Sequence, residues 1–175
     1  MKKILYTLLL ICGISTTANA QFYNEILLFI EVGKTIEDSS TIIYLHFDSD
    51  GNMYKYSMGK STARDKYKKG VLKEYGINQK HNIKRDRSVS TGKYDGVYSK
   101  PRYVSGGWGV TGYFMGYPQY GNTTVRSGNE YYAVSDDEMV TWSTTNDSNE
   151  AKYKKYYKAI DPSDLVPKEV DYDFL

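Results

Sequence analysis

The tripeptide Gly59-Lys60-Ser61 has the residue types of a phosphate-binding loop and lies between a predicted strand and a predicted helix. The complete motif also needs a glycine five residues before Gly59, and Tyr54 occupies that position. A tyrosine there removes part of the glycine-rich backbone that surrounds phosphates in such loops. We therefore interpret Gly59 as a turn residue and expect no nucleotide and no other cofactor.

Histidine and cysteine, which often bind metals or take part in nucleophilic catalysis, are rare in this chain. His46 and His81 are the only histidines, and the sole cysteine is Cys12. In the acidic run 48–52, Gly51 stands at the fourth position, whereas a calcium loop of the EF-hand type places its glycine at the sixth. We expect no metal and assign no catalytic residue. A catalytic carboxylate pair stays open, because such pairs are recognised by their separation in space.

The most distinctive stretch is 106–121, in which six glycines alternate with five aromatic residues. Glycines leave neighbouring rings uncovered, and exposed rings can stack on sugars or pack against a partner. The alternative is that the glycines let a bent strand pass beneath aromatic core residues. As a ligand-binding face, the stretch would use Trp108, Tyr113, Tyr117 and Tyr120.

Positive charge is concentrated in residues 51–90, which hold eleven Lys or Arg against three Asp or Glu. One interpretation is a patch for an anionic glycan or another polyanion, and the other is a solvated helix face and loop. The candidate polyanion patch consists of Lys66, Lys69, Lys73, Lys84, Arg85 and Arg87.

Residues 1–20 have the pattern of a cleaved signal peptide. Lys2 and Lys3 precede an apolar stretch, and Ala18-Asn19-Ala20 supplies a small-x-small cleavage site. A lipoprotein anchor at Cys12 is the alternative, but Ile11 stands where lipidation signals have a small residue. We expect an exported protein, periplasmic or secreted, with mature residues 21–175 free of cysteine. No transmembrane segment is expected after cleavage.

Tyrosine, with 19 residues, is abundant and favours strands. Apolar residues that recur every four positions, among them Ala63 and Tyr67, predict one helix over about 61–76. The polar stretch 79–91 predicts a loop. Segment 151–160 fits a helix or a strand, and its tyrosine density favours the strand. Short runs of alternating or β-branched residues predict strands at 22–30, 41–47, 53–58, 93–104, 108–117, 131–135 and 139–143.

These elements predict a mostly β, single-domain protein: an antiparallel β-sandwich or open barrel with the helix inserted after the first hairpin. The tail after about residue 167 is acidic and is expected to be frayed.

The leader, the hairpin from Tyr131-Tyr132-Ala133-Val134-Ser135 to Trp142, and the tyrosine-rich end before Asp164-Leu165 resemble small secreted proteins of uncharacterised function from Bacteroides-type bacteria. This resemblance implies a compartment and a fold class but no activity. We expect an exported, non-catalytic domain that binds a glycan or protein partner, and no nucleic acid. A small carboxylate-dependent glycan hydrolase is the alternative. The sequence leaves the oligomeric state open.

Overall fold

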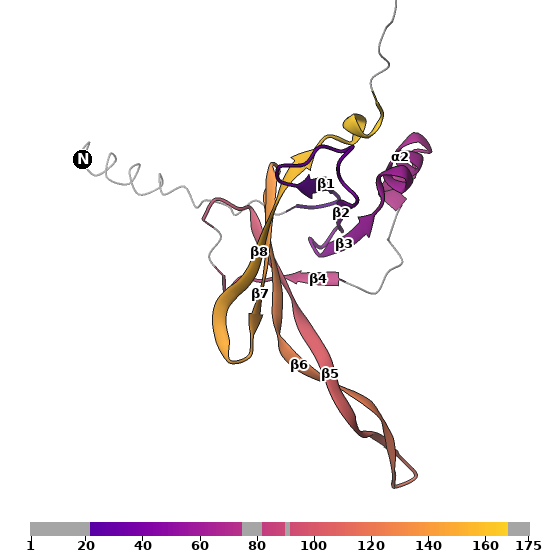
Figure 1. The fold of residues 1–175 in the computed structure, drawn as a ribbon, viewed down its shortest axis with the longest axis vertical. Coiled ribbons are helices and arrows are strands. Elements are labelled where there is room, and N and C mark those ends of the chain that lie inside the picture. The colour runs from indigo at the N-terminus through magenta and orange to yellow at the C-terminus, as the bar shows by residue number, and fades with distance from the viewer. Residues whose placement is uncertain (1–21, 75–81, 90–91, 168–175) are drawn as a thin grey trace, which may run out of the picture.

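The computed structural model describes residues 22–74, 82–89 and 92–167, and its eight strands form a closed antiparallel barrel (Figure 1). Each strand pairs with the next along the chain, and the last pairs with the first. The elements are β1 Ile26–Glu31, β2 Ile42–Phe47, β3 Met53–Met58, α2 Lys60–Lys68, η1 Leu72–Glu74, β4 Asn82–Arg85, β5 Gly96–Phe114, β6 Tyr117–Val134, β7 Glu138–Thr145, β8 Ser148–Ile160 and η2 Pro162–Leu165.

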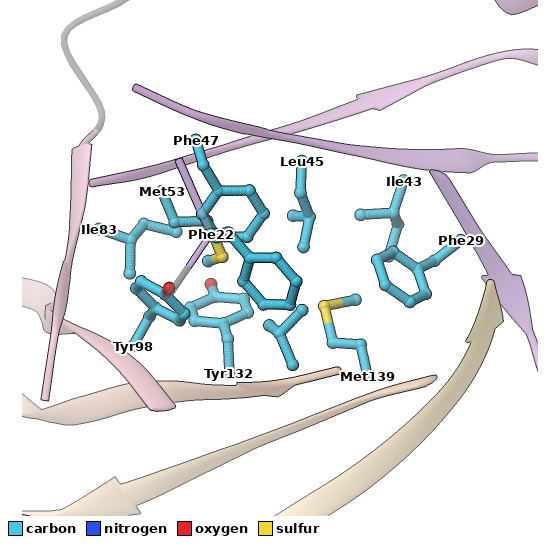
Figure 2. Close-up of a cluster of buried hydrophobic side chains, with 11 residues drawn as sticks. Phe22, Phe29, Ile43, Leu45, Phe47, Met53, Ile83, Tyr98, Tyr132 and Met139 are labelled. Carbon is cyan, nitrogen blue, oxygen red and sulfur yellow. The ribbon is translucent and has the colours of Figure 1, made fainter. Parts of the chain in front are cut away.

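One apolar cluster fills the inside of the barrel (Figure 2). Successive side chains of a strand point to opposite faces, so alternate residues such as Ile43, Leu45 and Phe47 all face inward. They meet Tyr98 and Tyr132, which come from β5 and β6 on the other side. Burial raises the pKa of Tyr98 to about 12, so its phenol stays neutral at physiological pH.

A second apolar cluster lies on the outer face of β1, β2 and β3, beneath α2 and the two short 3-10 helices. The Tyr44 hydroxyl donates to the Leu72 carbonyl at 2.7 Å, which ties β2 to η1. The Arg64 side chain of α2 donates to the Leu165 carbonyl at 2.6 Å and so connects the helix to η2. The barrel therefore has a core on both faces of its first three strands.

The predicted β-rich class with one inserted helix is confirmed, and the barrel is closed rather than open. The first hairpin, β2–β3, and the strand at 151–160 are also confirmed. The helix is shorter than the predicted 61–76, because it ends at Lys68 and Gly70 adopts a left-handed φ of +68°. That conformation, which suits glycine after a helix, stops the helix early.

Two other boundaries were wrong. The predicted loop 79–91 contains β4, and the strands predicted separately at 93–104 and 108–117 are joined in the continuous strand β5, which ends at Phe114 and includes Pro101. Proline is tolerated there because β4 pairs with β5 only as far as Ser99, so Pro101 has a neighbour only on the β6 side. The predicted leader, His81 and the end of the acidic tail lie outside the described residues.

The strands β5 and β6 continue far beyond the barrel as a two-stranded ribbon (Figure 1). The ribbon begins at a β-bulge where Arg102 pairs with Gly128 and Tyr103 with Arg126. Gly128 is buried and has a φ of +138°. In the part of the chain that the structure covers, no helix has the length and apolar character needed to cross a bilayer.

Candidate binding surface on the projecting hairpin

The four aromatic residues predicted as a ligand-binding face are all strongly exposed on the ribbon. The exposed fractions are 75% for Trp108, 74% for Tyr113, 72% for Tyr117 and 59% for Tyr120. This exposure excludes the alternative in which the glycine-rich stretch covers core aromatics. The residues stand on a ribbon in solvent, outside both buried clusters.

The cross-strand register places three of these four residues on one face. Tyr113 pairs with Pro118, Val110 with Tyr120, and Trp108 with Asn122. Residues opposite each other share a face, and so do positions two apart along β6, such as 118, 120 and 122. Trp108, Tyr113 and Tyr120 therefore form one row together with Val110, which we call the aromatic face.

Tyr117 lies on the opposite face, where it pairs with Phe114 beside the turn. Glycines dominate the rest of that face: Gly112 pairs with Gln119, and Gly109 with Gly121. On this face, the glycine face, the side chains of Thr123 and Thr111 lie 3.2 Å from where a Cβ on Gly109 and Gly121, respectively, would stand. The prediction that Tyr117 joins the other three is wrong, because it stands an odd number of positions from Tyr120 along one regular strand.

Two bulges interrupt β5 in the ribbon, and the second keeps Trp108 and Tyr113 on the same face. The register shifts between Ser105 and Gly107 and again between Val110 and Gly112. At the first bulge a Cβ on Gly106 would lie 2.6 Å from Val125 Cγ2 and 2.7 Å from Thr123 Oγ1, so a larger residue there would require these side chains to move. Without the second bulge, Trp108 and Tyr113 would lie on opposite faces, since they are five residues apart.

The tip is a two-residue turn formed by Met115 and Gly116, with φ angles of 49° and 83°. Positive φ at both central positions is the geometry of the type I′ turn, whose twist matches that of the flanking strands. Met115 adopts this conformation less readily than glycine and is 84% exposed. The turn thus presents a flexible apolar side chain at the far end of the molecule.

The ribbon carries no charge between Arg102 and Arg126. Its exposed apolar side chains include Val104, Val110 and Val125 in addition to the aromatics. Large contiguous apolar patches are rare on soluble monomers and mark interaction surfaces. A two-stranded hairpin is also only marginally stable by itself in water. The ribbon therefore has the composition and exposure of a surface that a partner covers.

The six residues of the candidate polyanion patch do not lie on one element. Lys66 is in α2, Lys69 caps it, and Lys73 is in η1, whereas Lys84 and Arg85 are in β4 and Arg87 follows that strand. Lys69 pairs with Asp65 at 3.0 Å, and the Arg85 side chain donates to the Asp95 carbonyl at 3.2 Å. Lys84 and Arg85 are adjacent in a strand and so face opposite ways.

Binding of a polyanion by these residues stays a prediction. If they bind heparin, retention should fall steeply with salt, because exposed charges are screened over about 8 Å at physiological ionic strength. Reversing Lys66, Lys69 and Lys73 to Glu should then abolish retention on a heparin column. Equal retention of this variant and the wild type would support a solvated helix face instead.

Two cavities among the described residues each contain one carboxylate, Glu130 in the larger and Glu31 in the smaller, and both carboxylates are paired with lysines. Glu130 accepts a hydrogen bond from the Tyr132 hydroxyl at 2.7 Å and lies 3.1 Å from the Lys100 amine. These contacts lower the pKa of Glu130 although burial opposes them. Glu31 pairs with Lys34 at 2.8 Å, which also lowers its pKa. Both carboxylates are therefore held in the charged form at neutral pH.

Glu25 differs from these carboxylates. Burial, followed by the nearby charges of Asp136 and Asp95, raises its pKa. The sequence analysis did not identify this cluster of three carboxylates, because Glu25, Asp95 and Asp136 belong to distant segments of the chain. None of them lines the cavities that hold Glu130 and Glu31.

His46 lies in β2 with its ring 5.9 Å from that of Tyr54 and its Nδ1 buried. Burial lowers the pKa of His46 below its usual 6.5, and the charge of Asp48 only partly offsets this effect. The unfolded chain therefore binds a proton at a higher pH than the folded protein does. The stabilisation that neutral His46 contributes is fully present above about pH 6.5. It declines as the pH falls toward the pKa that His46 has in the folded protein.

The His46→Gln variant should show a flatter pH dependence of unfolding in that window. The measurement is denaturant unfolding of both proteins between about pH 8 and pH 5. An identical slope in the two proteins would mean that His46 titrates as it does in the unfolded chain.

Comparison with known proteins yields no match: no family model fits the sequence, and neither curated proteins nor solved structures are significantly similar to it.

Proposed function

We propose that the chain is an exported, non-catalytic binding domain that docks onto a protein partner through the β5–β6 ribbon. The observation that carries the proposal is the uncharged ribbon, which holds Trp108, Tyr113 and Tyr120 on one exposed face. The barrel has its own buried core and serves as the scaffold that projects the ribbon. The signal-peptide pattern of residues 1–20 supports a partner outside the cytoplasm.

The composition of the ribbon favours a protein over a glycan. Cores of protein interfaces are enriched in Tyr, Trp, Phe and Met and depleted of charge. The ribbon matches this pattern, since Phe114 and Met115 at its tip and the valines along it add to the aromatic face. Aliphatic and thioether side chains offer sugar hydroxyls no hydrogen bonds, so they would contribute little to glycan recognition.

The state of the cavity carboxylates favours binding over glycan hydrolysis. A general acid for glycoside cleavage needs a raised pKa, so that it is protonated when the leaving group departs. Glu130 and Glu31 have lowered pKa values because each is paired with a lysine. Hydrolysis would have to use another carboxylate, such as Glu25, whose pKa is raised.

The proposal is tested by placing a photo-crosslinking amino acid at Tyr113 or Tyr120 in the native host. Illumination should give one discrete protein adduct from each of these positions, because both lie on the aromatic face. The matched control is the same amino acid at Tyr153, which is 87% exposed but belongs to β8.

Adducts that form equally well from position 153 would contradict the proposal, since exposure alone would then explain them. Failure of both ribbon positions to form any protein adduct would also contradict it. Retention of the purified protein on a glycan array in that case would assign the ribbon to sugars.

A further inference from the structure

The inner face of the barrel changes from apolar to polar toward the end where the ribbon leaves. Along β3, Met53, Lys55 and Ser57 point inward, with Met53 in the apolar core. Lys55 pairs with the inward-facing Leu45, and Lys155 of β8 pairs with Thr141. Two lysines from opposite sides of the barrel therefore face the same polar space.

Two cavities open into this space, with volumes of about 400 and 290 Å³. Lys55 and Lys155 line both cavities. Volumes of this order match small-molecule sites in proteins, which start at roughly 300 Å³. The lysines thus lie where a small ligand could contact both.

Positive charge in the larger cavity exceeds negative charge. Lys55, Arg102 and Lys155 line it together with a single carboxylate, Glu130. That carboxylate is already paired with Lys100 at 3.1 Å. Among the described residues, no carboxylate lies within ion-pair distance of the Lys55 amine, which sits 5.4 Å from the centre of the Tyr132 ring.

The surroundings of Lys55 disfavour the charged form of its amine. Burial lowers its pKa, the neighbouring Lys100 lowers it further, and Glu130 offsets only part of the effect. Lys155 adds a third like charge. An anion beside Lys55 would relieve this repulsion, which is the driving force for binding one.

Three aromatic residues, Tyr131, Trp142 and Tyr153, also line the larger cavity, although strand alternation puts the rings of Tyr131 and Trp142 on the outer face of the barrel, opposite to Tyr132 and Thr141. Tyr131 and Trp142 stack with centroids 5.2 Å apart and planes 11° from parallel. Tyr153 also lines this cavity and has a φ of 56°, a strained value for a residue other than glycine. Strain of this kind gathers at ligand sites, where it positions a side chain.

We propose that this polar end of the barrel binds a small organic carboxylate, with the acid group beside Lys55 and Lys155. Such a ligand supplies the negative charge that the lysines lack. The site lies at the base of the ribbon, where Arg102 lines the larger cavity, and it does not depend on a protein partner at the aromatic face.

Trp142 provides a reporter for the experiment. The chain has two tryptophans, so the Trp108→Phe variant leaves Trp142 as the only one. In this background, D-glucuronate and benzoate are titrated against their neutral counterparts, D-glucose and benzamide. We expect a saturable change in Trp142 fluorescence with at least one acid and none with its neutral counterpart.

Lys55→Met should weaken binding of that acid about tenfold or more, because it removes a charge-assisted contact. Lys158→Met is the matched control, since Lys158 is an exposed residue of the same strand as Lys155 but lines neither cavity. The thermal midpoint of Lys55→Met should equal or exceed that of the parent, which shows that the variant is folded. No saturable response to either acid, or equal weakening by both substitutions, would overturn the proposal.

Discussion

Gly128→Ala should destabilise the protein by about 3 kcal/mol or more, the largest effect that we expect from any single added methyl group. A Cβ at this position would lie 2.0 Å from the Thr144 carbonyl oxygen and 2.7 Å from its carbon. Both are backbone atoms of the neighbouring strand β7, so they cannot move aside as the end of a side chain can. The φ of +138° adds strain for any L-residue.

Gly112→Ala is the control for this substitution, because it lies in the same ribbon with no atom within 4 Å of an added Cβ and without a positive φ. Its free energy of unfolding should change by less than about 0.5 kcal/mol. Denaturant unfolding of both variants measures the difference. Equal stabilities would mean that the bulge at Gly128 relaxes and does not fix where the ribbon leaves the barrel.

Trp108→Ala and Tyr120→Ala should each reduce affinity for the protein partner by about 2 kcal/mol or more, the scale of an interface hot spot. Their thermal midpoints should barely change, because both side chains are mostly exposed in the free protein. Tyr98→Ala should do the opposite and lower stability by about 3–5 kcal/mol, since Tyr98 is fully buried in the barrel.

Tyr153→Ala controls for exposure, because Tyr153 is more exposed than the other described tyrosines outside the ribbon, and this substitution should affect neither partner binding nor the thermal midpoint. Thermal melts alone already separate the two interpretations of the glycine-rich stretch. A loss of stability from Trp108→Ala as large as that from Tyr98→Ala would show that the ribbon packs against the barrel in solution.

Much of the fold could be predicted because strand patterns are local. The tyrosines at 54 and 56 alternate with Met53, Lys55 and Ser57, which is the pattern of a strand with two different faces. The same alternation contained a signal for the polar cavity, since it places Lys55 on the face opposite the tyrosines. That face proved to be the inside of the barrel, and only closure of the sheet brings Lys155 near it.

Some errors came from features that depend on distant residues. Strand β4 is polar except for the buried Ile83, so its sequence pattern is that of a loop until β3 and β5 pair with it. The bulges in β5 could not be predicted from its sequence either, because a register shift is defined by the pairing with the partner strand. The error at Tyr117 had another source, because Tyr117 and Tyr120 are three positions apart in the regular part of β6, and strand alternation alone puts them on opposite faces.

The most direct test of the ribbon as a docking surface replaces residues 106–123 by Asn-Gly. This change joins Ser105 to Thr124, an opposing pair of the ribbon, through a two-residue turn suited to a type I′ hairpin. The partner identified by crosslinking is purified and titrated against the full protein and this variant. We predict that the variant keeps its thermal midpoint and loses measurable binding. A folded variant that binds the partner with unchanged affinity would contradict the account.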